Sequence, residues 1–379
     1  MSQAATPDPS SLFQPFSHGA LHLANRIVMA PMTRCFSPGG VPGADVAAYY
    51  RRRAEAGIGL IVTEGAWIPH PAAANEENAP RFYGEDALSG WRHVVAEVHA
   101  AGGKIMPQLW HTGLTRRPVL ENLYAPVVED LSLKVSPSGY VMAGEKVGEG
   151  MSHGEIETLI AAYAQAALTA KTLGFDGVEI HGAHGYMVDQ FFWHETNRRT
   201  DHWGGPTLAA RARFGVELVR AIRAHVGPGF PIILRFSQWK LQDYAARLAH
   251  TPAELATLLE PLSDAGVDIF HASQRRFWEA EFPGSDLNLA GWAQKLTGKP
   301  AITVGSIGLE QEMLQTMFSP EPAAPSRLDR LFEMLARGDF SLAAIGRALL
   351  ADPRWAQKIH ARAEATLQPY SAASLASLF

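Results

Sequence analysis

One short stretch of the chain, GVEIHGAHGYM at residues 177–187, ends in side chains that can hold or move a proton. His181, His184 and Tyr186 follow apolar and β-branched residues, and none of the three fills a core as well as leucine would. A lone histidine at a strand end is more often structural than functional. Two histidines and a tyrosine at one strand exit instead indicate a site that binds a polar group or transfers a proton.

Polar side chains also follow other strand-like runs. In APMTR, Pro31 and Met32 would bring backbone close to a ligand and Thr33 offers a hydroxyl. Gln108, in QLWH, has both a donor and an acceptor, which suits the imide edge of a flat heterocycle. Arg235, in LRFS, supplies a positive charge that would stabilise an anionic ring.

The last two strand-like runs end in a phosphate-binding pattern. Gly305 and Ser306 follow one run, and Gly346 and Arg347 follow the other. Together they offer backbone N–H groups, a hydroxyl and a guanidinium, and a guanidinium can bind a phosphate through two hydrogen bonds. Combined with a glutamine for an imide edge and a cation for a ring, this pattern predicts a flavin mononucleotide (FMN) site.

The elements that must position these residues repeat along the chain. Nearly continuous apolar runs alternate with helix-type segments, as expected for parallel strands covered on both faces. The eight predicted strands cover residues 26–32, 59–65, 103–110, 175–185, 230–237, 267–273, 299–306 and 340–350. Eight such units predict an α/β fold, a single (β/α)₈ barrel of the TIM type, whose active sites lie at the carboxyl ends of the strands. A doubly wound open sheet is the alternative, weakened by the absence of GxGxxG after the first strand.

We interpret residues 1–379 as one domain, because the chain contains no repeat and no low-complexity linker. Residues 1–15 are predicted to be an N-terminal extension, judged from their Pro and Ser content. The irregular segment 111–151, after the third strand, is rich in Gly, Pro and Ser. Loops of this length are usually functional lids or added hairpins, so we predict an inserted lid there.

Composition narrows the class of protein. Hydrophobic residues make up 47% and charged residues 19% of the chain, as in ordinary soluble proteins. The formal net charge of −5 gives no reason to expect nucleic-acid binding. The single cysteine, Cys35, excludes an internal disulfide framework. No secretory signal and no apolar run of about 18 residues is found, so we expect a cytoplasmic protein with no membrane partner.

The sequence resembles the old yellow enzymes, the ene-reductase branch of the NADH:flavin oxidoreductases. The resemblance runs from about residue 12 to residue 355 and rests on NRIVMAPMTR, TEGA, QLWHTG, HGAHGYMVDQFF, TNRRTDHWGGP and IGRALLADP, in the order of the family. It implies tightly bound, non-covalent FMN in a (β/α)₈ barrel. The positions that match flavin contacts are Pro31, Met32, Thr33, Gly65, Gln108, His181, Arg235, Gly305, Ser306, Gly346 and Arg347.

The resemblance also implies an activity. NADPH or NADH would reduce the flavin, which would then pass hydride from N5 to the β-carbon of an α,β-unsaturated carbonyl or nitro compound. His181 and His184 match the pair that binds the substrate oxygen, and Tyr186 matches the donor of a proton to the α-carbon. Many family members have asparagine at the position of His184. Segment 237–250 and the tail after Trp355 match the family poorly, so they receive no carried-over role.

Two other functions remain open. The histidines could be ligands of a metal-dependent hydrolase barrel, but no further ligand at the first or eighth strand supports this, and we predict no metal site. The chain could instead bind flavin without reducing alkenes, against which the presence of Tyr186 argues. The expected partners are a small enone or nitroalkene. The sequence does not determine the physiological substrate or the preferred nicotinamide, and either a monomer or a homodimer is compatible with it.

Overall fold

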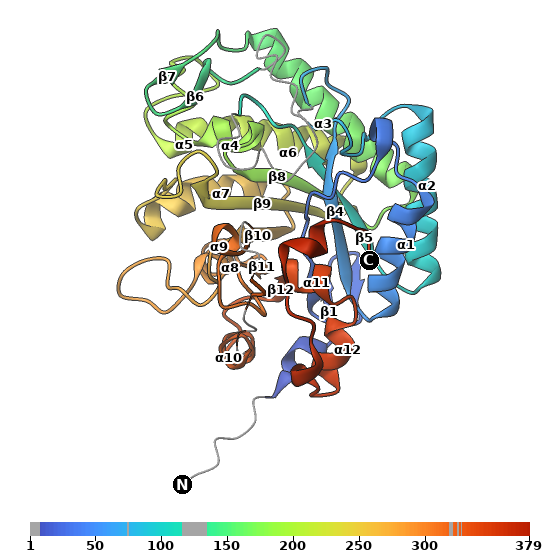
Figure 1. Cartoon of the computed structure of the whole chain (residues 1–379). Helices are drawn as coiled ribbons and strands as arrows, with labels where there is room; N and C mark the ends of the chain where they lie inside the picture. Colours follow the sequence, from blue (N-terminus) through green and yellow to red (C-terminus); the bar gives the residue numbers. More distant parts are fainter. Residues whose placement is uncertain (1–7, 74–75, 116–134, 318–320, 324–325, 327) are drawn as a thin grey trace.

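A computed structural model of the chain describes residues 8–379, apart from 74–75, 116–134, 318–320, 324–325 and 327. The predicted closed barrel is confirmed (Figure 1). Eight strands form it in chain order, each parallel to its neighbours, and the last pairs with the first. They are β3 (Ile27–Met29), β4 (Leu60–Trp67), β5 (Ile105–Trp110), β8 (Val178–His184), β9 (Ile232–Lys240), β10 (Ile269–Ser273), β11 (Ala301–Val304) and β12 (Leu342–Ile345).

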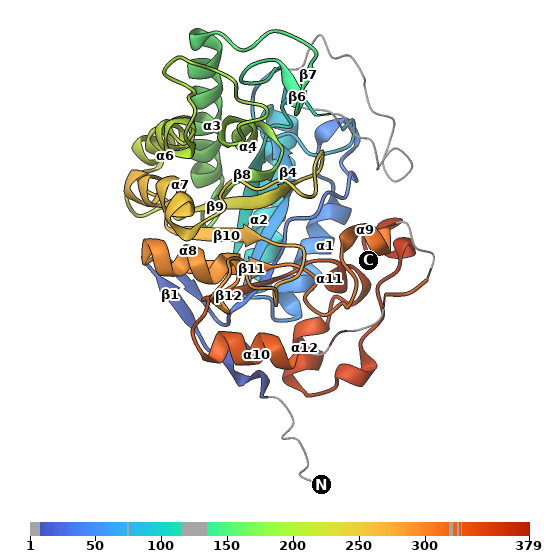
Figure 2. The same cartoon turned by 90° about the vertical axis from the view of Figure 1, so that its left-hand side faces the viewer.

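Helices surround the barrel, as the view in Figure 2 shows. Those between strands include α1 (Ala44–Glu55), α2 (Glu85–Ala100), α3 (His153–Leu173), α4 (Met187–Phe192), α5 (Leu208–Arg211), α6 (Arg213–Val226), α7 (Pro252–Ala265), α8 (Leu289–Thr297), α9 (Met313–Met317) and α10 (Asp329–Ala336). After the last strand come α11 (Arg347–Ala351) and α12 (Trp355–His360). Local sequence favours them: Ser152 and Glu155 form a capping box at the start of α3, and Gly174 ends it with a φ of 87°.

The barrel interior is apolar at one end and polar at the other. The apolar end is a cluster of buried side chains from β3, β4, β5, β9, β10, β11 and β12. The antiparallel hairpin of β1 (Phe16–His18) and β2 (Leu21–Leu23) adds Phe16, Leu21 and Leu23 to the same cluster. Toward the carboxyl ends, register places His181 beside Arg235 and Arg235 beside His271. The fold therefore places polar side chains at the predicted active-site end.

Strand β9 extends three residues beyond the predicted end at residue 237. The extension is possible because the β8–β9 pairing shifts register between Gly182 and His184, which brings His184 opposite Lys240. Such a bulge bends the strand and re-aims side chains, and it leaves little trace in a hydrophobic pattern. The first four residues of segment 237–250 thus belong to a barrel strand rather than to a loop.

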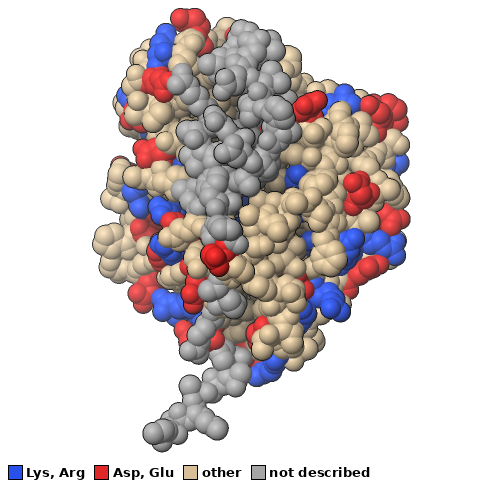
Figure 3. All heavy atoms as spheres, viewed as in Figure 1, with Lys and Arg blue, Asp and Glu red and all other residues tan. Residues whose placement is uncertain are grey.

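The predicted lid, residues 111–151, contains a short antiparallel hairpin of β6 (Tyr140–Met142) and β7 (Glu145–Lys146), while residues 116–134 lie outside the described part. Of the predicted extension 1–15, the described residues include the 3₁₀ turn Pro9–Phe13. The lid function and the single-domain interpretation remain predictions. In the part of the chain that the structure describes, no helix is long and apolar enough to cross a membrane. Basic and acidic side chains are interspersed over the face shown in Figure 3.

Candidate active site

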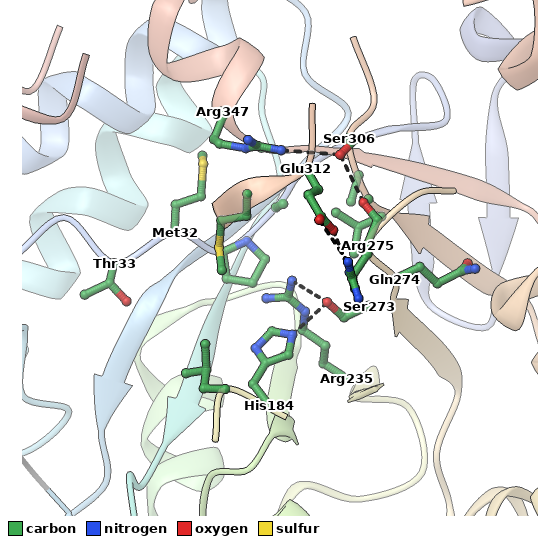
Figure 4. Close-up of a pocket in the computed structure, with 18 of the residues that line it drawn as sticks. Met32, Thr33, His184, Arg235, Ser273, Gln274, Arg275, Ser306, Glu312 and Arg347 are labelled. Carbon is green, nitrogen blue, oxygen red and sulfur yellow. Dashed lines mark hydrogen bonds and ion pairs between the residues drawn. The ribbon is translucent and has the colours of Figure 1, made fainter. Parts of the chain in front are cut away.

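A cavity opens at the carboxyl ends of the barrel strands. Twelve of the thirteen residues that the sequence singles out line this cavity, and Gly65 is the one outside it. The twelve are Pro31, Met32, Thr33, Gln108, His181, His184, Tyr186, Arg235, Gly305, Ser306, Gly346 and Arg347. Figure 4 shows several of these side chains converging from different strands. Gly65 pairs with Gln108 on β5, and a Cβ at Gly65 would come within 2.6 Å of the Trp110 indole. The glycine therefore makes room for a tryptophan that lines the cavity.

His181 is held as a neutral hydrogen-bond donor. Its ring is buried, and the backbone N–H of Ala183 donates to Nδ1 at 3.4 Å. Burial, reinforced by the nearby Arg235 guanidinium, lowers the pKa of His181 well below its ordinary value of 6.5. Because Nδ1 is an acceptor in this arrangement, the single proton of the ring lies on Nε2.

His184 has a different set of contacts. Its Nε2 lies 2.7 Å from the Ser273 hydroxyl oxygen, which also accepts a hydrogen bond from Arg235 at 3.3 Å (Figure 4). Since a guanidinium only donates, the Ser273 hydroxyl proton is available to His184 Nε2, and the ring proton then lies on Nδ1. Burial and the charge of Arg235 lower the pKa of His184 well below its ordinary value, so this ring is also neutral at pH 7.

Tyr186 lies at the start of α4, beside both His181 and Trp110. Its ring meets His181 edge-on at a centroid distance of 4.9 Å and Trp110 edge-on at 5.2 Å. These contacts fix the ring plane between two neighbours that also line the cavity. His181, His184 and Tyr186 therefore lie in one cavity, as their spacing on one strand exit predicts.

A buried polar network lies below these three residues. Gln108 donates through Nε2 to Glu179 at 2.8 Å, and the other Glu179 oxygen lies 2.6 Å from His271 Nδ1. Arg235 is only 7% exposed, and its Nε has no hydrogen-bond partner among the described residues. Burial lowers the pKa of Arg235, while the Glu179 carboxylate opposes that shift. A buried cation with an unused N–H at the cavity wall is suited to an electron-rich ligand atom.

The opposite end of the cavity contains the predicted phosphate-binding residues. Arg347 donates to Ser306 Oγ at 3.4 Å (Figure 4). It also donates to the Gln311 carbonyl at 3.2 Å and to the Thr316 hydroxyl. Burial lowers the pKa of Arg347 to about 10, so the group stays charged at neutral pH. Gly305 has a φ of 151°, and a Cβ there would come within 2.5 Å of the Gln274 carbonyl oxygen. Only glycine fits this close approach.

Several cavity residues were not predicted from the sequence. Trp239 stacks on His184 at 4.4 Å, and Tyr244 stacks on Trp239 at 5.1 Å. Arg275 makes two bonds to Glu312, at 2.5 and 2.8 Å. Further lining comes from Ser273, Tyr370 and Leu375. The only sequence signal for this wall is the aromatic spacing of SQWKLQDY, which is ambiguous without the extended β9.

Glu64, on β4, supports the turn that follows Thr33. It is 2% exposed and accepts hydrogen bonds from the backbone N–H groups of Arg34 at 2.8 Å and Cys35 at 3.1 Å. The bonds hold Cys35 at a φ of 57°. Burial nevertheless dominates and raises the pKa of Glu64 to about 7, despite the two N–H donors.

This shift predicts a pH-dependent contribution to stability. A raised carboxyl pKa means that the folded chain binds the proton more tightly than the unfolded chain, so stability falls as pH rises from about 4.5 to about 7. A shift of this size corresponds to roughly 3 kcal/mol. Glu64→Gln should remove this slope, whereas Glu85→Gln, at an exposed site, should keep it. Urea unfolding at several pH values measures both; parallel pH curves for wild type and Glu64→Gln would contradict the assignment.

No group of three or more His, Cys, Asp or Glu side chains that could hold a metal ion occurs among the residues that the structure describes. The cavity combines neutral imidazole donors, a tyrosine, the buried Arg235 guanidinium and the half-buried Arg347 guanidinium. Such a site can bind a large anionic ligand that carries a phosphate at one end, and a smaller polar molecule beside the histidines.

Comparisons with known proteins show the family and the fold of this chain. Residues 11–322 match the NADH:flavin oxidoreductase / NADH oxidase family. An NADH oxidase from Thermoanaerobacter brockii is 32% identical over 361 residues, which cover 92% of this chain but only 50% of that relative. Morphinone reductase aligns with a TM-score of 0.75 at 27% identity, over 96% of this chain and 92% of its own.

A further structure supports the fold alone. An old yellow enzyme homologue from Zymomonas mobilis has a TM-score of 0.75 at 24% identity and covers 96% of each chain. The family match spans most of this chain and includes strands β3 to β11 of the barrel. The chain belongs to the NADH:flavin oxidoreductase / NADH oxidase family, the old yellow enzyme family that its motifs resemble.

Proposed function

We propose that this protein is an FMN-dependent NAD(P)H ene-reductase that reduces the C=C bond of α,β-unsaturated carbonyl or nitro compounds. The observation that carries the proposal is the convergence of His181, His184 and Tyr186 with Arg235 and Arg347 in one cavity. Family membership supports a flavin and a nicotinamide reductant. The finer assignment to alkene reduction rests on His181 and His184 of β8 and on Tyr186, which follows that strand.

The residues present fit FMN. Arg347 and Ser306 would hold its phosphate, and Gly305 and Gly346 line the cavity beside them. Arg235, with its unused buried N–H, and Gln108 would hold the polar edge of the ring. Pro31, Met32 and Thr33 would contact the ring from the segment that follows β3, and Gly65 makes room for Trp110 beside it. Bound FMN would supply hydride transfer, taking hydride from NADPH or NADH and giving it to the β-carbon of the alkene.

The chain's own residues bind and protonate the substrate. Nε2–H of His181 donates to the substrate oxygen, and His184 contributes its Nδ1–H from a ring that Ser273 orients. Both rings are neutral, so these bonds strengthen as negative charge develops on the oxygen and favour the transition state over the ground state. Tyr186 donates a proton to the α-carbon. The hydride brings the electron pair of the new C–H bond at the β-carbon, and the π electron pair of the former C=C bond forms the C–H bond at the α-carbon with the Tyr186 proton. The tyrosinate left behind regains a proton from water.

The experiment measures two half-reactions separately. The first is the reduction of the flavin by the nicotinamide, and the second is the oxidation of the reduced flavin by the alkene. Under nitrogen, NADH or NADPH should bleach the visible absorbance of the purified FMN-containing protein, and cyclohexenone or a nitroalkene should restore it. Saturated cyclohexanone is the control and should not restore it. Recovery with oxygen alone would identify a flavoprotein without ene-reductase activity, and protein that binds no flavin would remove the proposal altogether.

Substitution of His181 tests the oxygen-binding role. His181→Ala should weaken the binding of a phenol, whose oxygen mimics the substrate oxygen, by roughly 10-fold to 100-fold, since a hydrogen bond to a charged oxygen contributes about 1.5–3 kcal/mol. A titration followed by flavin absorbance measures this. The exposed His250→Ala is the matched control. Unchanged phenol affinity in His181→Ala would show that the ring does not contact the ligand oxygen.

Other features stay predictions. We expect the protein to be cytoplasmic and to act as a monomer or homodimer, without nucleic-acid or membrane partners. Preference between NADPH and NADH is to be measured in the first half-reaction above.

A further inference from the structure

The turn that carries two of the three candidate catalytic residues has an unusual backbone. His184 has a φ of 66° and Gly185 a φ of 81°, so two consecutive residues occupy the left-handed region. That conformation is unfavourable for a histidine and persists only where surrounding contacts impose it. Tyr186 follows directly. The orientation of His184 and Tyr186 therefore depends on what holds Gly185.

The extended end of β9 holds this turn from one side. The His184 N–H donates to Ser237 Oγ at 2.9 Å, and the Leu241 N–H donates to the His184 carbonyl at 3.2 Å. Gln242 donates through Nε2 to the Gly185 carbonyl at 3.3 Å. Segment 237–242 thus holds three of the four backbone groups of His184 and Gly185, all but the Gly185 N–H.

A buried ion pair holds the remaining group. The Gly185 N–H donates to Asp189 Oδ2 at 2.7 Å, and the other oxygen of Asp189 bonds Lys240 Nζ at 2.7 Å. Lys240 also donates to the Ser237 carbonyl at 3.0 Å. Both side chains of the pair are 0% exposed. One ammonium group therefore connects β9, α4 and the amide between the two candidate catalytic residues.

Stability alone gives little reason for such a pair. Removing two charges from water is costly, and buried ion pairs are often no more stabilising than apolar residues of similar volume. Burial lowers the pKa of Lys240 and raises that of Asp189, which expresses the same cost. A pair retained at this position is better explained by the geometry that it imposes on Gly185.

We propose that Lys240 is a positioning residue of this enzyme, acting through the Asp189 carboxylate on the Gly185 amide to set the orientations of His184 and Tyr186. The proposal rests on the proposed function for its kinetic consequence. Lys240 lies in segment 237–250, to which the family resemblance gives no role.

The test compares three variants of the FMN-containing protein. Lys240→Met breaks the pair and leaves Asp189 buried without its partner. Lys240→Met/Asp189→Leu removes both charges while keeping volume, and it also removes the acceptor of the Gly185 N–H. Lys104→Met is the matched control, because it breaks the ion pair of Lys104 with Asp176 (2.9 Å) near the amino ends of the strands.

We expect both Lys240 variants to reduce cyclohexenone about 10-fold to 100-fold more slowly in the second half-reaction, the usual consequence of small misplacement of reacting groups. Flavin reduction by NADPH should change by no more than a few-fold. The double variant should regain stability toward urea, because no unpaired charge stays buried. Its reaction with cyclohexenone should stay slow, because the Gly185 N–H still lacks its Asp189 acceptor. Lys104→Met should match the wild type in both half-reactions.

A second measurement does not depend on activity. Hydrogen exchange, followed by mass spectrometry of the peptide around Gly185, should be faster by at least tenfold in both Lys240 variants and unchanged in Lys104→Met. A double variant with wild-type exchange and wild-type enone rate would overturn the proposal, as would an equal slowing of both half-reactions. If the wild type reduces no alkene, the proposed function fails, and hydrogen exchange alone decides whether Lys240 holds the turn.

Discussion

Replacing Tyr186 with phenylalanine is expected to slow the reaction with cyclohexenone by about 10²–10⁴-fold, the usual contribution of a positioned general acid. The substitution removes one hydroxyl and keeps the ring that packs against His181 and Trp110. Folding and flavin content should therefore stay close to those of the wild type. Flavin reduction by NADPH needs no proton from this residue, and its rate should change by no more than a few-fold. Stopped-flow absorbance of each half-reaction measures the two effects separately.

Nitroalkenes are the internal control for this prediction. Their nitronate product is stable enough to leave without a proton at carbon, so Tyr186→Phe should slow their reduction much less than that of cyclohexenone. Equal losses in the two half-reactions, or a wild-type rate with cyclohexenone, would return Tyr186 to a structural role.

Replacing Arg347 with alanine is expected to weaken FMN binding by roughly 10-fold to 100-fold. The FMN phosphate would lose a charged, bidentate hydrogen-bond donor, which lowers the binding free energy by about 1.5–3 kcal/mol. Arg347 keeps its charge at neutral pH despite burial, because its pKa falls only to about 10. Fluorescence titration of the flavin-free protein with FMN gives the dissociation constant.

Two further variants make the Arg347 result specific. Arg354→Ala removes an exposed arginine seven residues along the chain and should leave FMN affinity unchanged. Arg347→Lys keeps the charge but loses the fork geometry, so it should fall between the wild type and alanine. Full flavin retention in Arg347→Ala would place the phosphate elsewhere.

The barrel could be predicted from the sequence because each of its strands is buried on both faces. Such strands read as short apolar runs between helix-type segments, and polar residues at their ends stand out. His181, Gln108 and Arg347 were recognisable for this reason, each at the end of an apolar run. Their convergence then followed from the geometry of the fold, since the carboxyl ends of parallel barrel strands meet on one face.

The aromatic side chains of Trp239 and Tyr244, and the residues that hold the turn at 184–186, could not be predicted in this way. Trp239 and Lys240 lie on a strand extension that pairs with β8 only after a two-residue register shift, with the extra residues on β9, and such an irregularity leaves no clear signal in a hydrophobic pattern. Tyr370 and Leu375 line the cavity from the end of the chain, where Arg34 bonds the carbonyls of residues 374, 375 and 377. Contacts between segments so far apart depend on tertiary packing rather than on local pattern.

The pairing of β12 with β3 has a consequence for how the molecule is made. This seam joins the two ends of the barrel sequence, and the Arg26 side chain bonds the Ser341 carbonyl across 315 residues. Contacts of such high contact order form late, because the entropy of closing a long loop must be overcome first. The same seam divides the residues of the cavity, since Met32 follows β3 and Gln108 lies on β5, whereas Ser306 and Arg347 follow the last two strands. A nascent chain on the ribosome therefore has no complete cofactor site until β12 has emerged, and cofactor acquisition becomes a step that follows synthesis of almost the whole chain.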